Sequence, residues 1–242
     1  MSNFIIIFSI GHLLGDFYFQ TSDMAEKKEK EYSAVVEHAC FYLLGIAVAV
    51  IPWFDYKLLC YVFLLAITHF LIDSLKFGIV RKPNLKSSCM VFIADQFLHF
   101  LCIVVLSAGM YCYGITLKEC SIFNTFLTVL NLKSFQLIRW LLLVLLIWKP
   151  ANVFIKTVLD KYKSKKDEKI DNNPGELIGF LERLILIILM SLNQYGAIGF
   201  VLTAKSIARH SAIVNEKMTA EYYLMGTLLS IVFATVGVIT LV

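Results

Sequence analysis

Charged residues are scarce in this sequence, where Asp, Glu, Lys and Arg make up 17% of 242 residues. A soluble globular domain carries roughly 25% charged residues. Here 59% of the residues are hydrophobic, and the mean hydropathy is +0.75. This composition excludes an ordinary cytosolic or secreted domain and predicts an integral membrane protein.

Closely spaced cysteine pairs are also lacking. The sequence contains no CxxC motif, and most of its six cysteines fall within apolar runs, where cysteine behaves as a small apolar residue. This pattern argues against a disulfide framework and against a zinc-ribbon site. The cysteines are Cys40, Cys60, Cys89, Cys102, Cys112 and Cys120.

Long apolar runs, in contrast, are abundant. About 20 residues cross the hydrocarbon core of a bilayer, and the predicted fold class is an all-α polytopic membrane protein with about eight transmembrane helices. The first run follows MSNF, which supplies no basic segment, so we interpret it as a span and not as a signal peptide. The predicted spans are 4–20, 37–54, 57–80, 90–114, 135–158, 177–194, 196–210 (which is short) and 222–242.

We predict that the chain is a single membrane domain, 1–242, with two halves. The N-terminal half, 1–115, holds four spans, and the C-terminal half, 135–242, contains a lysine-rich loop at 159–176. Between them, segment 116–134 has Phe and Leu at about helical spacing, which is typical of an amphipathic helix on the outer membrane surface. Pro150 is expected to kink the fifth span.

Lysines and arginines in the connecting loops predict the orientation. Loops 21–36, 81–89 and 159–176 are rich in these residues, and they share one side of the membrane if the eight spans are correct. We therefore expect the N-terminus outside and these loops in the cytoplasm of a bacterium, with the protein in the inner membrane. The net charge of +4 then reflects topology and attraction to lipid headgroups, and no nucleic-acid partner is expected.

Histidine and aspartate recur four residues apart in the first four spans. The segments GHLLGD, HFLID and DQFLH each hold one such pair, and VVEHA adds a further histidine. Residues four apart share one face of an α-helix, and at 1.5 Å per residue all of these lie within roughly 15 Å of the predicted cytoplasmic face. The candidate metal ligands are His12, Asp16, His38, His69, Asp73, Asp95 and His99.

The energetic cost of these carboxylates predicts a metal site. A charged Asp near the centre of a span costs on the order of 3 kcal/mol, so three of them require cations. Mixed His and Asp ligands suit Zn²⁺ best here, with Mn²⁺ or Fe as alternatives. We predict one or two divalent ions with open positions, a metal-activated water, and Asp73 or Asp95 as general base, which together describe a metal-dependent hydrolase.

Other interpretations of the same cluster stay open. Single histidines in spans are usually packing residues with one hydrogen-bond partner, and Asp and His also line pathways in transporters or channels for divalent metal ions or protons. The outer halves of the first four spans are nearly all apolar, which favours a one-sided pocket over a pathway. A metal that only holds helices together is a third alternative.

A second polar set lies in the C-terminal half. Cations on neighbouring helix faces would hold a substrate phosphate, and we assign this role to Arg183, Lys205 and Arg209 of this half together with Lys76 of the N-terminal half. The alternatives are snorkelling of Lys205 and Arg209 and a structural ion pair between Glu182 and Arg183. The predicted substrate is a phosphoester, on a lipid headgroup or a nucleotide, and homo-oligomerisation stays open. Supporting roles fall to Gln20, Gln96, Glu176, Glu182 and Glu221.

Several of these segments together resemble a known family. GHLLGDFYFQTSDMAEKK, HFLIDSLK and ADQFLHF, with His38, are similar to the bacterial membrane proteins grouped as domain of unknown function 3307. GELIGFLER, AIGFVLTAKSIARH and AEYYLMGTLLS resemble its longer members. This resemblance implies no particular reaction. A looser similarity in ligand style to membrane-bound metal-dependent hydrolases, which also place His and Asp in successive spans, implies a hydrolase.

Overall fold

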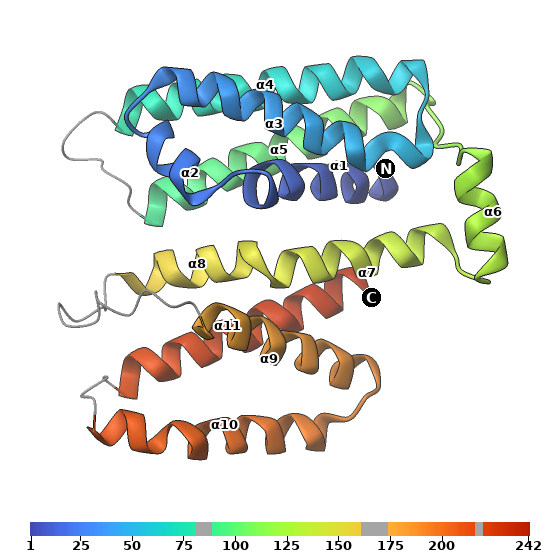
Figure 1. The fold of residues 1–242 in the computed structure, drawn as a ribbon. Helices are drawn as coiled ribbons and strands as arrows, with labels where there is room; N and C mark the ends of the chain where they lie inside the picture. Colours follow the sequence, from blue (N-terminus) through green and yellow to red (C-terminus); the bar gives the residue numbers. More distant parts are fainter. Residues whose placement is uncertain (81–88, 161–173, 216–219) are drawn as a thin grey trace. The chain divides into compact units, whose positions relative to one another are not determined.

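The computed structural model describes residues 1–80, 89–160, 174–215 and 220–242, without the side chains of residues 80, 174, 209–215 and 220. Every regular element within these residues is helical (Figure 1), which confirms the predicted all-α class. Most of the predicted lysine-rich loops at 81–89 and 159–176 lie outside the described residues.

Five of the described helices, some with the short helix that adjoins them, are long and apolar enough to cross a membrane. A sixth span results if α1 (Ser2–Leu13), the π-helix η1 (Leu14–Tyr18) and α2 (Ser22–Lys28), which bend by 89°, are taken together. The chain is thus a membrane-type helical protein, and the count of eight stays a prediction. The five spans are Tyr32–Trp53, Tyr56–Ile79, Cys89–Cys112, Ser134–Leu159 and Glu221–Leu241.

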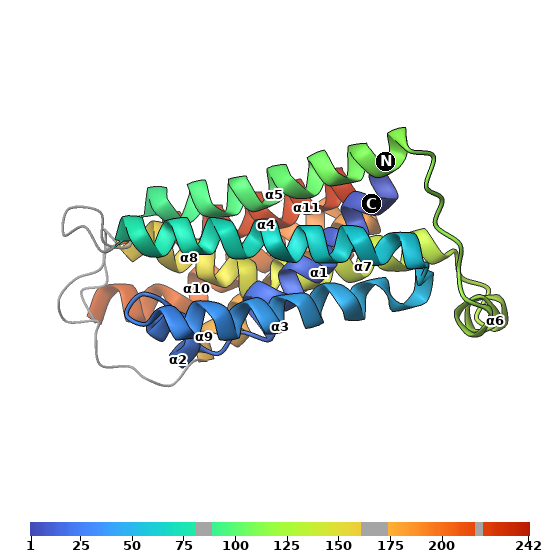
Figure 2. The ribbon, with the colours of Figure 1, turned by 90° about the horizontal axis from the view of Figure 1, so that it is seen from above.

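The chain divides into two compact units, Met1–Leu142 and Leu143–Val242. In the first unit, α1 packs against α3 (Tyr32–Val50) and α5 (Cys89–Cys112), and α4 (Tyr56–Val80) packs against the same two helices. We call these four helices the first bundle. Successive helices run in opposite directions (Figures 1 and 2), so α2 and the start of α3 lie at the same end as the start of α5.

Helix α1 approaches α3 closely because three glycines lie at their contact. A Cβ on Gly45 would lie 2.7 Å from the Gly15 backbone nitrogen and 2.9 Å from the Gly11 carbonyl oxygen. A Cβ on Gly15 would lie 2.9 Å from Tyr42 Cα. Gly11 and Gly15 form a GxxxG motif, the spacing that lets membrane helices bring their backbones together. The contact fixes the π-helical segment that carries Asp16 against α3.

The end of the first unit that lies away from α2 is closed by aromatic packing. The 3₁₀-helix η2 (Ile51–Trp53) buries Trp53, whose ring lies 5.3 Å from Phe123 of α6 (Ser121–Val129) and 6.1 Å from Phe135 of α7 (Ser134–Ile147). Helix α6 is shorter than the predicted amphipathic segment 116–134, and it leaves most of its apolar side chains exposed.

The second unit contains the end of α7, α8 (Lys149–Leu159), α9 (Pro174–Ser191), α10 (Tyr195–Asn215) and α11 (Ala220–Leu241). The helical segment formed by α7 and α8 is interrupted at Trp148, two residues before Pro150, which was expected to kink the fifth span. Buried Arg183 donates from Nε to the Ile147 carbonyl at this break (2.6 Å) and also bonds Ser230 and Asn152. A neighbouring side chain thus satisfies a carbonyl at the break, as membrane helices require.

Candidate metal centre

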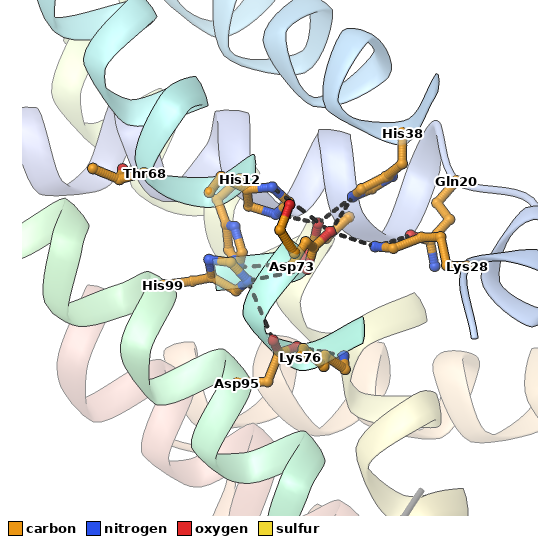
Figure 3. Close-up of polar contacts among 12 residues, drawn as sticks. His12, Gln20, Lys28, His38, Thr68, Asp73, Lys76, Asp95 and His99 are labelled. Atoms are coloured by element: carbon orange, nitrogen blue, oxygen red, sulfur yellow. Dashed lines mark hydrogen bonds and ion pairs between the residues drawn. The ribbon is translucent and has the colours of Figure 1, made fainter. Parts of the chain in front are cut away.

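The seven side chains predicted as ligands meet inside the first bundle. Each of its helices contributes: α1 with η1, α3, α4 and α5 all carry members of the cluster, and the labelled side chains of His12, His38, Asp73 and His99 point toward one centre (Figure 3). The four histidines, Asp73 and Asp95 are buried, and the Asp16 side chain is 10% exposed. Spacing predicted one face per helix, and packing brings these faces together.

Asp16 occupies the half of the cluster that is rich in imidazoles. Its Oδ1 lies 2.8 Å from His69 Nε2 and 3.0 Å from His38 Nε2, and its Oδ2 lies 3.8 Å from His12 Nε2. Gln96 donates to Asp16 Oδ2 (3.3 Å) and accepts from His12 through Oε1 (3.2 Å). Three imidazole nitrogens from three helices therefore surround one carboxylate.

Asp73, Asp95 and His99 form the other half. His99 Nε2 lies 3.5 Å from Asp95 Oδ1 and 3.7 Å from Asp73 Oδ1. Asp73 also approaches the first half, since its Oδ2 lies 3.6 Å from His38 Nε2 and 3.9 Å from His69 Nδ1. The two halves are contiguous, and this one is rich in carboxylate oxygens.

Two lysines complete the second half. Lys28 Nζ lies 2.7 Å from Asp73 Oδ2 and also donates to Gln20 Oε1 (3.2 Å). Lys76 Nζ lies 2.8 Å from Asp95 Oδ2. Each of these carboxylates therefore has an ammonium partner, from α2 for Asp73 and from α4 for Asp95.

Aromatic stacking fixes the central imidazole. The His69 ring stacks on Tyr42 with a centroid separation of 3.5 Å, and on its other side it stacks on His99 at 4.2 Å with an interplanar angle of 17°. Stacking on both faces restricts rotation of the ring, so the position of its two nitrogens is set by α3 and α5 as well as by its own helix.

The cluster contains ligand sets of the size that a divalent ion requires. Three groups of three have ligand atoms within 4.8 Å of one another: His12, Asp16 and His69; His38, His69 and Asp73; and Asp73, Asp95 and His99. The first and third groups share no residue. The donors could thus hold two ions at once, one in each half.

Several of the nitrogen and oxygen atoms that could bind a metal are buried without hydrogen-bond partners among the described residues. They are His12 Nδ1, His38 Nδ1, His69 Nδ1, Asp73 Oδ2, Asp95 Oδ1 and His99 Nε2, and the last four of these have only the ion-pair contacts given above. Buried polar atoms are nearly always paired, and a group of unpaired ones requires an explanation such as an ion. The donor types and these free atoms both fit a divalent metal.

Residues 4–127 match the family described as "Protein of unknown function (DUF3307)". The chain belongs to this family. All seven cluster residues and both lysines fall inside the matched segment, whereas the second unit lies beyond it. No curated protein and no solved structure matches the chain. The family description assigns no activity, so chemistry must be argued from the site.

The other residues predicted for the site are divided between the two units of this DUF3307 protein. Gln20, Gln96 and Lys76 lie at the cluster. In the second unit, Arg183 bonds neutral groups. Glu182 pairs with Lys205 and not with Arg183, which was the alternative to a substrate-binding role.

The remaining predicted residues also belong to the second unit. Glu176 lies near Lys156, with 3.6 Å between Oε2 and Nζ, and its carbonyl accepts from Asn152. Glu221 is exposed in the first turn of α11. The Arg209 side chain lies outside the described residues.

Sequence reasoning missed Lys28 and Tyr42. Lys28 lies in a lysine-rich loop that the orientation already explained, so its charge carried no separate signal. Tyr42 lies one turn beyond His38 on the same helix, at the spacing of four that identified the other pairs. That spacing was the available signal for its stacking on the cluster.

Proposed function

We propose that this protein is a membrane-embedded metal-dependent hydrolase that acts on a phosphoester at the cytoplasmic leaflet. The observation that carries the proposal is the convergence of two separate three-residue ligand sets inside the first bundle, with one lysine from α2 and one from α4 beside them. Two adjacent metals beside cations are suited to phosphoester hydrolysis, since both the attacking and the leaving oxygen need charge stabilisation.

The roles of the residues follow from their places. His12, Asp16, His38, His69, Asp73, Asp95 and His99 would hold one or two ions, with zinc as the first candidate. A bound ion supplies a water whose pKa is lowered to near 7. Asp73 or Asp95, whichever is not fully engaged as a ligand, would accept the proton of that water. Lys76 stabilises negative charge on the substrate.

For the setting of the site we propose a bacterial inner membrane, eight spans and an outside N-terminus. Helix α2, with Lys27 and Lys28 and with Lys30 just after it, lies at the same end of the first bundle as the start of α5. Lysines favour the cytoplasmic side, so the cluster, which lies toward this end, would open toward the cytoplasm. The substrate is then a phosphorylated lipid headgroup or a nucleotide at that surface.

The burial pattern favours an enzyme over a transporter or channel for divalent metal ions or protons. Apart from the cluster, Ser107 is the one side chain classed as buried and polar among the described residues of the first unit. The buried positions toward the other end are apolar, including Ile46, Val50, Leu58 and Met110. A pathway would continue in polar side chains across the bundle, whereas a pocket ends where these do.

The test is elemental analysis of the detergent-purified protein beside the double variant Asp73→Ala, His99→Ala. We expect one or two transition-metal ions per chain in the native protein and a reduced content in the double variant. Exposed Glu37 on α3 supplies the matched control, Glu37→Ala, which should keep the native content. Metal-loaded protein is then screened against lipid and nucleotide phosphoesters.

The outcomes separate the candidate functions. Metal-dependent phosphate release that is lost in the double variant supports the hydrolase. Equal metal content in all three proteins, or none in any, contradicts the metal site. Metal uptake into vesicles without phosphate release would favour the transporter. Unfolding upon chelation, without activity in the loaded protein, would indicate a structural ion.

A further inference from the structure

The two halves of the cluster differ in how their carboxylates are neutralised. Among the described contacts, Asp16 has imidazole and amide partners and no lysine or arginine. Asp73 and Asp95 each hold an ammonium group, at 2.7 Å and 2.8 Å. An ion that binds beside Asp16 meets no competing cation, whereas an ion that binds in the other half must compete with two.

The lysines are more open to the surroundings than the carboxylates they contact. The side chains of Lys28 and Lys76 are 15% and 33% exposed, whereas those of Asp73 and Asp95 are 3% and 6% exposed. Lys28 lies on α2, which follows the 89° bend and is capped by Thr21 through the Met24 amide. The ammonium groups therefore lie at the more exposed edge of the cluster.

Donor atoms remain for an ion in this half while the lysines are bound. Lys76 contacts Asp95 Oδ2, and the other oxygen of Asp95, Oδ1, is buried without a hydrogen-bond partner 3.5 Å from His99 Nε2. As a divalent ion draws the carboxylates toward itself, its charge repels the neighbouring ammonium groups. Ammonium groups that lose a carboxylate need another anion, and a phosphate dianion supplies oxygens for both.

We infer that Lys28 and Lys76 are exchangeable counter-ions, which bind the substrate phosphate when a second divalent ion occupies Asp73, Asp95 and His99. This inference rests on the proposed function, and it adds Lys28 and a binding order to it. The ion and the phosphate then bind cooperatively, because each stabilises the charge that the other exposes. The phosphate belongs to a lipid monoester or to a soluble molecule, since both present the same dianion.

The experiment measures Mn²⁺ and phosphate binding to the full-length protein in detergent. Mn²⁺ suits an oxygen-rich site, and its binding is followed by loss of the free-ion electron paramagnetic resonance signal. The variant is Lys28→Met, Lys76→Met, with each single variant measured in parallel and gel filtration used to verify folding. Lys30→Met is the matched control, because Lys30 pairs with exposed Glu26 on the same segment.

In the native protein we expect the second Mn²⁺ to tighten inorganic phosphate binding by about tenfold or more, the effect of one charge-assisted contact. The lysine variants should bind the second Mn²⁺ more tightly, because a competing cation is gone, and should bind phosphate at least about tenfold more weakly. Lys30→Met should match the native protein in both. Opposite shifts of the two affinities are not expected from ion pairs that only stabilise the fold.

Two arms identify the source of the phosphate. One uses inorganic phosphate, and the other uses micelles with phosphatidic acid against the same micelles with phosphatidylcholine. If the second Mn²⁺ tightens phosphate binding in one of these arms, and the lysine variants lose this effect, the inference is supported and that arm identifies the source. Metal-loaded native protein that binds phosphate in neither arm, or lysine variants that bind it as the native protein does, overturns the inference alone. Native protein without any metal overturns the proposed function as well.

Discussion

Substitution of Gly45 by alanine tests the close contact that positions Asp16. The added Cβ would lie 2.7 Å from Gly15 N and 2.9 Å from Gly11 O, where ordinary contact begins at 3.4 Å. Both neighbours are backbone atoms, so no side-chain rotation relieves the overlap and α1 must move by several tenths of an ångström. Overpacking of this kind costs roughly 1–3 kcal/mol. The same movement shifts His12 and Asp16 away from their partners, so we also expect a lower metal content.

The assay is equilibrium unfolding in mixed micelles, with metal analysis of the folded fraction. Gly109→Ala on α5 is the matched control, because a Cβ there meets nothing within 4 Å. Alanine in an unobstructed helical position should leave stability unchanged or raise it by up to about 1 kcal/mol. If Gly45→Ala proves as stable as Gly109→Ala and keeps the native metal content, the contact does not position the site and the reasoning is refuted.

Three further expectations concern the rest of the chain. Arg183→Lys should lose at least about 1.5 kcal/mol for each hydrogen bond that lysine cannot make, whereas exposed Arg139→Lys should stay within about 0.5 kcal/mol of the native protein; equal unfolding curves would contradict a structural role. Trp53→Ala should cost about 3–5 kcal/mol, because the ring is buried against α6 and α7, and a loss below about 1 kcal/mol would show that this end is loosely packed. In single-cysteine variants, a membrane-impermeant maleimide should label exposed Cys120 from outside and leave Cys89 unlabelled; the reverse result would invert the proposed orientation.

Much of the candidate site could be predicted because helical periodicity is a local property. A spacing of four places His69 and Asp73 on one face of a helix wherever that helix lies. Composition likewise predicted the membrane class. In the fold, apolar side chains such as Phe63 and Leu75 are exposed, which suits contact with lipid. These inferences needed no knowledge of how the helices pack.

The missing parts depend on contacts between distant segments. Lys28 reaches Asp73 only because the chain bends by 89° before α2, and no local spacing encodes that bend. Within the sixth predicted span the sequence allows an ion pair between Glu182 and Arg183, whereas the fold pairs Glu182 with Lys205 of the next helix. Arg183 satisfies a carbonyl at the break in α7–α8, which periodicity within its own helix could not reveal.

The π-helix η1 has a consequence for helical phase. The widened turn at Leu14–Tyr18 accommodates an additional residue relative to a regular α-helix, so α1, which ends at Leu13, and the residues of this turn follow different angular registers. Loss of one residue within this stretch would rotate one part against the other by about 100°. His12 and Asp16 would both still be present, but Asp16 would turn away from His38 and His69. A relative of this chain that lacks one residue between the two would keep the composition of the motif and lose its geometry.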